Sequence, residues 1–252
     1  MRYAIVTALI LAAFISQAQP DPLAEMQRLL DEGFYALAAQ FEGPRLLVEF
    51  PDLPEAHFLF AYALYLTGDP RAAQVLRRAL ELSGEPQPRY LWLDGLLHAQ
   101  EGDFAAAKRL LESAFTQSQA YVIAMDWGRI AWQSGDFADA LRAFEAAAQT
   151  EPGQCCEPWP HLNRGRLLLL EGRFQEAMLA FDKALDILDA TDTDGGLPSP
   201  AYAEAFYHLG RSHEALGDLA SATANYEAAR SSDPTHGPTL AALARLQERR
   251  AP

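Results

Sequence analysis

Glycines recur through this chain at intervals close to 34 residues, and this spacing limits its fold more than any other feature. The steps are 34, 33, 37 and 45 residues in the series Gly68, Gly102, Gly135, Gly172 and Gly217. A second glycine lies seven residues before each of the last four, at Gly95, Gly128, Gly165 and Gly210. A glycine inside a helix costs about 1 kcal/mol relative to alanine. Glycine recurs at the same place despite this cost, which predicts repeated units that require a small residue there.

Small and aromatic residues keep the same register after the last four of these glycines. Five residues on lie Ala107, Ala140, Ala177 and Ala222; nine on lie Leu111, Phe144, Phe181 and Tyr226; twelve on lie Ala114, Ala147, Ala184 and Ala229. We therefore expect helix pairs. Gly128 would lie where a neighbouring helix backbone approaches closely, and Gly135 would end the first helix with a positive φ. Phe144 would fill the wedge between helices.

This register resembles the tetratricopeptide repeat, a helix-turn-helix unit of 34 residues. The resemblance is strong in three units and covers essentially the whole mature chain. One of the three contains Trp127, Gly128, Gly135, Phe137, Ala140, Phe144, Ala147 and Pro152. It implies an all-α fold, a right-handed superhelical solenoid of antiparallel helix pairs. The repeats would span approximately residues 20–53, 54–87, 88–120, 121–153, 158–190 and 203–236, with a polar capping helix over 238–250. Residues 19–252 would form one solenoid.

The first eighteen residues have the pattern of a secretory signal peptide. Arg2 precedes an uncharged apolar run that ends at Ile15, and small residues lead to a cleavage site after Ala18. An uncleaved membrane anchor is the alternative, but the run is shorter than the roughly 20 apolar residues of a spanning helix. We expect an extracytoplasmic protein, periplasmic or secreted, with no membrane span in the mature chain.

The chain is acidic, with a net charge of −14. Loss of residues 1–18 would remove one positive charge and no negative one, which gives −15. Such a surface repels the phosphate backbone, so we expect no binding to nucleic acid. The acidity itself is typical of a soluble surface.

Two insertions interrupt the period, and insertions in such arrays map to loops. One contains Asp189, Asp192 and Asp194, but a calcium loop would need acids where Ala190 and Ala201 stand, so an acidic linker is expected. The other contains the only cysteines, Cys155 and Cys156, with His161 nearby. A vicinal disulfide, a bridge between chains and a thiophilic metal site all remain open. A structural or incidental role is favoured, because no zinc spacing is present.

The sequence contains no pattern of catalytic residues. The nucleophile elbow, the H-E-x-x-H zinc motif and the phosphate loop are all absent. The six histidines are spread through the repeats, where satisfied or exposed side chains are usual. We therefore expect no enzyme activity, no cofactor and no catalytic site, and no metal site apart from the alternative left open at Cys155 and Cys156.

The resemblance implies that the first helix of each repeat lines a concave groove in which peptides bind. By register, the groove-facing residues are Phe58, Tyr62, Tyr65, Trp92, Met125, Arg129, Trp132, Arg166, Tyr207 and Arg211. Aromatic rings would anchor apolar side chains of a peptide, and the three arginines would hold acidic groups. The alternative is that the arginines shield apolar surface and pair with Glu204 or Glu214. The lysine and asparagine clamp known in this family is not present.

Three classes of function follow. The leading one is a protein-interaction scaffold that supports a secretion, pilus or outer-membrane machine in a bacterial envelope. A metal or redox accessory protein that uses Cys155 and Cys156 is the second. A structural element that associates with further copies of itself is the third. The choice of the first rests on fold, which alone does not fix function.

Overall fold

A computed structural model describes residues 22–191 and 199–250. The expected signal peptide therefore lies outside the described residues, as do Asp192 and Asp194 of the second insertion. The chain divides into two compact units, an N-terminal unit that ends at Glu101 and a C-terminal unit that begins at Gly102. The described residues of both units form helices and contain no strand, which confirms the all-α prediction.

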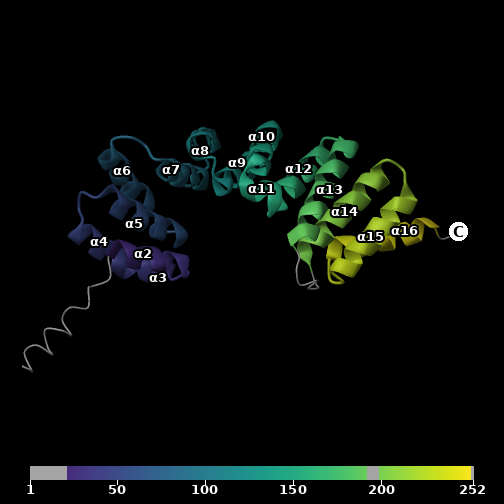
Figure 1. Ribbon diagram of the computed structural model, residues 1–252, viewed down its shortest axis with the longest axis horizontal. Coiled ribbons are helices and arrows are strands. Elements are labelled where there is room, and N and C mark those ends of the chain that lie inside the picture. Colours follow the sequence, from purple (N-terminus) through teal and green to yellow (C-terminus); the bar gives the residue numbers. More distant parts are fainter. Residues whose placement is uncertain (1–21, 192–198, 251–252) are drawn as a thin grey trace, which may run out of the picture. The chain divides into compact units, whose positions relative to one another are not determined.

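The N-terminal unit contains three full helices after an irregular first repeat (Figure 1). Its elements are α2 (Pro22–Asp31), α3 (Tyr35–Leu37), a π-helical turn η1 (Ala38–Glu42), α4 (Gly43–Glu49), α5 (Pro54–Leu66), α6 (Ala72–Ser83) and α7 (Pro88–Gln100). The turn η1 joins α3 to α4, so the second helix of the first repeat is continuous but irregular. Gly43 begins α4 directly beneath the ring of Phe60 on α5.

The C-terminal unit continues the alternation of first and second helices (Figure 1). Its elements are α8 (Phe104–Ser118), α9 (Tyr121–Gln133), α10 (Phe137–Gln149), α11 (Glu151–Cys155), α12 (Trp159–Leu170), α13 (Phe174–Thr191), α14 (Pro200–Ala215), α15 (Leu219–Ser232) and α16 (Gly237–Arg250). Each helix packs mainly on its neighbour in sequence, as in α9 with α10 and α14 with α15. No helix among the described residues is long and apolar enough to cross a membrane.

The turn between the helices of a repeat is built by the glycine and the acid that follows it. Gly135 has φ +78°, a conformation that glycine adopts without the penalty of a Cβ atom. The next residue, Asp136, caps α10, because its carboxylate accepts a hydrogen bond of 3.2 Å from the backbone N–H of Asp139. The same Gly-Asp pair turns the chain before α8 and α15.

The glycine in the middle of each first helix makes room for an aromatic ring. A Cβ atom on Gly128 would lie 2.5 Å from Cε1 of Phe144, on the second helix of the same repeat. Gly165 stands in the same way against Phe181, and Gly210 against Tyr226. The expectation that these glycines admit a helix backbone is therefore wrong. In each repeat, the aromatic ring occupies the space that a side chain at the glycine position would need.

The structure differs from the sequence prediction at the first insertion. A loop was expected there, but residues Glu151–Cys155 form the short helix α11. The Thr150 hydroxyl begins it by accepting a hydrogen bond from the Gly153 N–H, and Pro152 occupies a favourable first-turn position. Gly153 is buried against the backbone of α10, where a Cβ atom would lie 2.1 Å from the Ala147 carbonyl oxygen.

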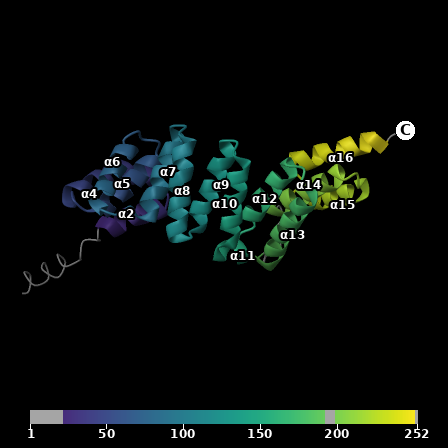
Figure 2. The same cartoon turned by 90° about the horizontal axis from the view of Figure 1, so that it is seen from above.

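Helix α16 closes the C-terminal unit (Figure 2). Its apolar residues Ala242, Leu243 and Leu246 are buried against Ala222 and Tyr226 of α15. The exposed side chains Arg245 and Arg249 lie on the remaining surface of α16. The closing helix thus covers the last repeat, as a terminal cap must.

Candidate functional site

The predicted groove residues of the N-terminal unit form one aromatic cluster. The Tyr62 ring stacks at 6.2 Å from Phe58 and at 6.4 Å from Tyr65, both also on α5. Trp92 of α7 approaches Tyr62 to 5.5 Å at a tilt of 55°. Phe58 is only 6% exposed, so it forms the floor of the cluster, whereas the other three rings are partly exposed. Rings in this arrangement offer a rigid apolar contact surface.

A cation lies at the edge of this aromatic cluster. The Arg89 guanidinium stands 5.1 Å from the Phe58 ring centre and 5.3 Å from that of Tyr90. Arg89 also forms an ion pair with Glu55, to which its Nη1 atom donates a hydrogen bond of 2.7 Å. Burial and the nearby Glu55 carboxylate raise the pKa of Tyr90. The charge of Arg89 is therefore already balanced within the unit.

In the C-terminal unit, four of the predicted residues line one open pocket of about 450 Å³, here called the Trp132 pocket. Its lining residues are Met125, Asp126, Arg129, Trp132, Gln133, Phe144, Asn163 and Arg166. The lining is mainly apolar, with two arginines among it. A pocket of this size suits one or two side chains of a bound segment.

The repeat core holds the floor of the Trp132 pocket in place. Trp132 meets Phe144 edge to face, with ring centres 6.2 Å apart. Phe144 is 1% exposed and is locked against Gly128, so the partly exposed indole rests on a rigid support. The glycine register that shapes the repeat therefore also positions the binding surface.

The two arginines of the Trp132 pocket differ in whether they are paired with a carboxylate. The Arg166 guanidinium lies 5.1 Å over the Trp132 ring and, among residues 22–191 and 199–250, forms no ion pair. Arg129 donates a hydrogen bond of 3.0 Å from Nη2 to the Asp126 carboxylate, four-fifths of which is buried. A guanidinium stacked on an indole keeps its edge nitrogens available to a carboxylate. The pocket thus combines an apolar floor with an available cation.

A second open pocket, of about 740 Å³, lies at the C-terminal end and is here called the Arg211 pocket. Its lining residues are Tyr207, Arg211, Glu214, Ala215, Arg245 and Arg249. Tyr207 and Arg211 were predicted from the repeat register, whereas Arg245 and Arg249 come from α16 and were assigned only to a polar cap. Their spacing of four residues on the closing helix is the sequence signal that places both on one face.

The arginines of α16, rather than those of the groove positions, neutralise Glu214. Arg245 donates to Glu214 at 2.6 Å, Arg249 at 3.3 Å, and the Tyr226 hydroxyl at 2.8 Å. Burial opposes ionisation of Glu214, but the hydrogen bonds from Arg245 and Tyr226 outweigh it and lower its pKa. Arg211 forms no ion pair with any residue that the structure describes.

Glu204 is paired with two histidines rather than with an arginine of the groove. His208 Nε2 lies 3.1 Å from one Glu204 oxygen, and His236 Nε2 lies 3.7 Å from the other. The hydrogen bond from His208 lowers the pKa of Glu204, and burial lowers the pKa of His208. Among the described residues, neither glutamate forms an ion pair with Arg166 or Arg211, although the charge of Arg166 adds to the lowering of the pKa of Glu204.

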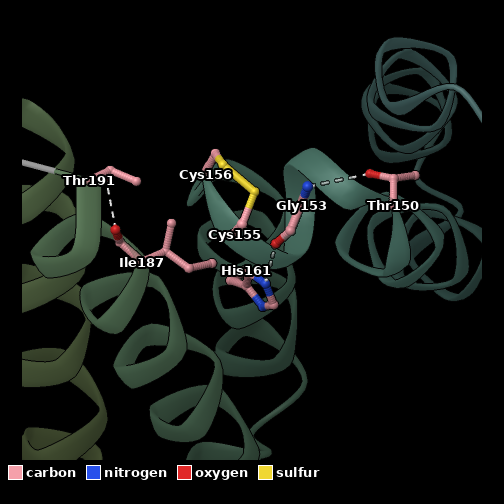
Figure 3. The surroundings of a disulfide bond; sticks show 7 residues. All are labelled: Thr150, Gly153, Cys155, Cys156, His161, Ile187 and Thr191. Atoms are coloured by element: carbon pink, nitrogen blue, oxygen red, sulfur yellow. Dashed lines mark hydrogen bonds between the residues drawn. A yellow bond between two sulfur atoms is a disulfide. The ribbon is translucent and has the colours of Figure 1, made fainter.

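The only two cysteines of the chain are joined to each other. Cys155 and Cys156 form a vicinal disulfide at the exposed end of α11 (Figure 3). His161 points away from the sulfurs, with Nε2 3.1 Å from the Gly153 carbonyl oxygen. Burial lowers the pKa of His161. No group of three His, Cys, Asp or Glu side chains within residues 22–191 and 199–250 is arranged to hold a metal ion.

Comparison with known families identifies the repeats. Models of the tetratricopeptide repeat match residues 88–113, 125–194 and 203–236. The chain therefore contains tetratricopeptide repeats, as the glycine register predicted. Both the Trp132 pocket and the predicted part of the Arg211 pocket lie within the matched residues.

Individual relatives are distant. A curated relative, cellulose synthase operon protein C of Pseudomonas fluorescens, is 28% identical over 118 residues, which are 47% of this chain and 8% of that protein. The chain thus spans a small part of its length. PilW, described as a widely conserved type IV pilus biogenesis factor, has a TM-score of 0.67 at 16% identity over 88% of this chain and 96% of PilW. YrrB, described as a TPR protein with an unusual peptide-binding site, has a TM-score of 0.62 at 19% identity over 79% and 96%.

Proposed function

We propose that this chain, whose residues 88–113, 125–194 and 203–236 are tetratricopeptide repeats, is a non-catalytic scaffold that holds a peptide segment of a partner protein. The segment would lie along the groove-facing helices α9, α12 and α14. An apolar side chain would enter the Trp132 pocket, and an acidic group would pair with Arg166.

The observation that carries this proposal is the composition of the Trp132 pocket. Its indole is partly exposed on a rigid floor, and the cation above that indole forms no ion pair within the part of the chain that the structure describes. Structural arginines on acidic chains are usually neutralised by neighbours, as Arg173 is by Glu171 and Glu176. An aromatic anchor beside an available guanidinium is typical of binding surfaces, where Trp and Arg contribute most.

The aromatic cluster of Phe58, Tyr62, Tyr65 and Trp92 is a second contact surface in this proposal. Its cation, Arg89, is neutralised by Glu55, so the cluster would bind apolar rather than acidic side chains. The N-terminal unit would thereby contribute affinity, whereas the arginines of the C-terminal unit would select for charge.

We place the scaffold outside the cytoplasm, in support of an envelope assembly such as a pilus or secretion machine. The signal-like residues 1–18, with cleavage near Ala18, support export. The disulfide of Cys155 and Cys156 is suited to an oxidising compartment. The likeness to a pilus biogenesis factor supports the class of assembly.

A partner capture with reversed charges tests this function. The purified protein and the variant Arg129→Glu, Arg166→Glu are used to capture partners from a cell-envelope extract, and bound proteins are identified by mass spectrometry. The matched control is Arg173→Glu, Arg230→Glu, which makes the same change of charge at exposed ion pairs outside both pockets. The function predicts a partner retained by the wild type and the control and lost by the pocket variant. Equal capture by all three proteins would refute it.

A further inference from the structure

The Arg211 pocket collects positive charge on a chain that is strongly negative. Three guanidinium groups, from α14 and α16, line the pocket together with one carboxylate, that of Glu214. The four groups together carry a net charge of +2, whereas the chain carries −14. A cationic recess on an acidic protein concentrates the field on an anionic ligand.

The three arginines differ in how far their hydrogen-bond donors are available to a ligand. Arg245 forms a close ion pair with Glu214, at 2.6 Å. Arg249 is held less closely, at 3.3 Å, and its side chain is more than half exposed. Arg211 has no ion-pair partner among the described residues. Two donors, Arg211 on α14 and Arg249 on α16, are therefore available on different helices that border the pocket.

We propose that the Arg211 pocket binds two neighbouring side-chain carboxylates, from Asp or Glu residues of the partner segment. The inference rests on the function proposed above and names the acidic feature of the segment. One carboxylate pairs with Arg211 and the other with Arg249, which balances the net charge of the pocket. A guanidinium donates two parallel hydrogen bonds to a carboxylate, so both pairs fix geometry as well as charge.

The shape of the pocket favours two separate carboxylates over one compact dianion. The volume is about 740 Å³, many times that of a single phosphate group. Glu214 also stands among the arginines, so a phosphate in contact with all three guanidinium groups would be brought against its carboxylate. Two carboxylates on a peptide pair with Arg211 and Arg249 separately, so no single group has to contact all three guanidinium groups.

A peptide selection tests the inference. A random library of 12-residue peptides with amidated C-termini is selected on the purified wild type, on Arg211→Gln and on the control Arg230→Gln. Amidation removes the terminal carboxylate, so acidic side chains alone supply the negative charge. Arg211 forms no ion pair with a described residue, so its replacement leaves none of their carboxylates unpaired. Far-UV circular dichroism verifies that the helices persist. We expect enrichment of paired Asp and Glu residues on the wild type and on Arg230→Gln, and loss of that enrichment on Arg211→Gln.

A double-mutant cycle between Arg211 and the acidic pair of one enriched peptide separates an effect on binding from an effect on folding. Replacement of its acidic pair by Gln-Gln is expected to weaken binding to the wild type about three- to tenfold, the range of partly screened ion pairs. The same replacement should have at most a small effect on binding to Arg211→Gln. An acidic pair that matters equally to both proteins would overturn this inference and leave the scaffold function intact. A wild type that selects no peptide at all would overturn both.

Discussion

The fit between Gly128 and Phe144 makes Gly128→Ala a sharp test of how the repeat is built. Alanine is the better helix former, so a surface substitution of this kind would stabilise α9 by about 1 kcal/mol. Here the added methyl group would lie 2.5, 2.7 and 2.9 Å from three atoms of the Phe144 ring. The ring is 1% exposed, so a shift of the ring would disturb the core around it and the Trp132 pocket that it lines.

The magnitude follows from these opposing effects. Overpacking of a filled core typically costs about 1–3 kcal/mol, and the helix preference of alanine offsets about 1 kcal/mol of it. Because all three distances are below 3.0 Å, we take the cost from the upper part of that range, about 2–3 kcal/mol, and expect Gly128→Ala to lower the free energy of unfolding by about 1–2 kcal/mol. Urea unfolding monitored by circular dichroism and by the fluorescence of Trp127 and Trp132, on the same helix, measures the change.

A second substitution shows whether the clash is the cause. The N-terminal unit has Ala61 and Leu76 at the corresponding places of its α5–α6 pair, both fully buried. The double variant Gly128→Ala, Phe144→Leu copies that pair and should be more stable than the sum of the single effects allows, by about 1 kcal/mol or more. The control Gly135→Ala, where no atom lies within 4 Å of the added Cβ, should lose stability through its positive φ alone and show no coupling to Phe144→Leu. If Gly128→Ala is neutral or stabilising, or if the double variant shows no coupling, contact with the Phe144 ring is not what requires glycine at position 128.

Three further results are expected. Asp136→Ala should lower the free energy of unfolding by about 1 kcal/mol or more, measured in urea, because Asp136 both caps α10 and pairs with Lys108 at 2.5 Å; an unchanged midpoint would contradict this role. Burial holds the pKa of His208 and His161 below the ordinary 6.5, so the unfolded chain takes up more protons and stability should fall as pH drops from about 7.5 to about 5.5. His208→Phe should make that fall shallower, whereas an identical slope would exclude His208 as a cause. Thiol titration of the unreduced, denatured protein should find no free thiol, since Cys155 and Cys156 form a disulfide; two reactive thiols would contradict the bond.

The sequence predicted the repeat architecture because its constraints are local and periodic. Positive φ at Gly135 follows from the residue type at the end of a helix, and the structure confirms it. The sequence analysis predicted a helix backbone next to Gly128, whereas the nearest group is the Phe144 ring. The register shows that a small residue is needed but not which group approaches it. Helix α11 was missed because five residues are too few to show a helical period. The arrangement of residues 19–252 as one solenoid stays a prediction.

The candidate site was predictable to the extent that it lies within one helix face. Met125, Arg129 and Trp132 recur at helical spacing on α9, and Arg166 holds the same place one repeat later, so register alone grouped them in the Trp132 pocket. Arg249, like Arg245, was not assigned to the site, because α16 lies outside the repeat register and its direction depends on how Leu243 and its apolar neighbours pack. That these residues bind a peptide stays a prediction.

Site-specific photocrosslinking shows whether the Trp132 pocket holds the partner segment. A photoreactive amino acid is placed at Gln133, which lines the pocket, and in a separate protein at Leu179, which is 68% exposed on α13 outside both pockets. Both proteins are irradiated in cell-envelope extract, and the crosslinked peptides are sequenced by mass spectrometry. We expect one defined partner segment to be crosslinked from Gln133 and to be absent from the products of Leu179. The same products from both positions, or a partner crosslinked only from Leu179, would contradict it.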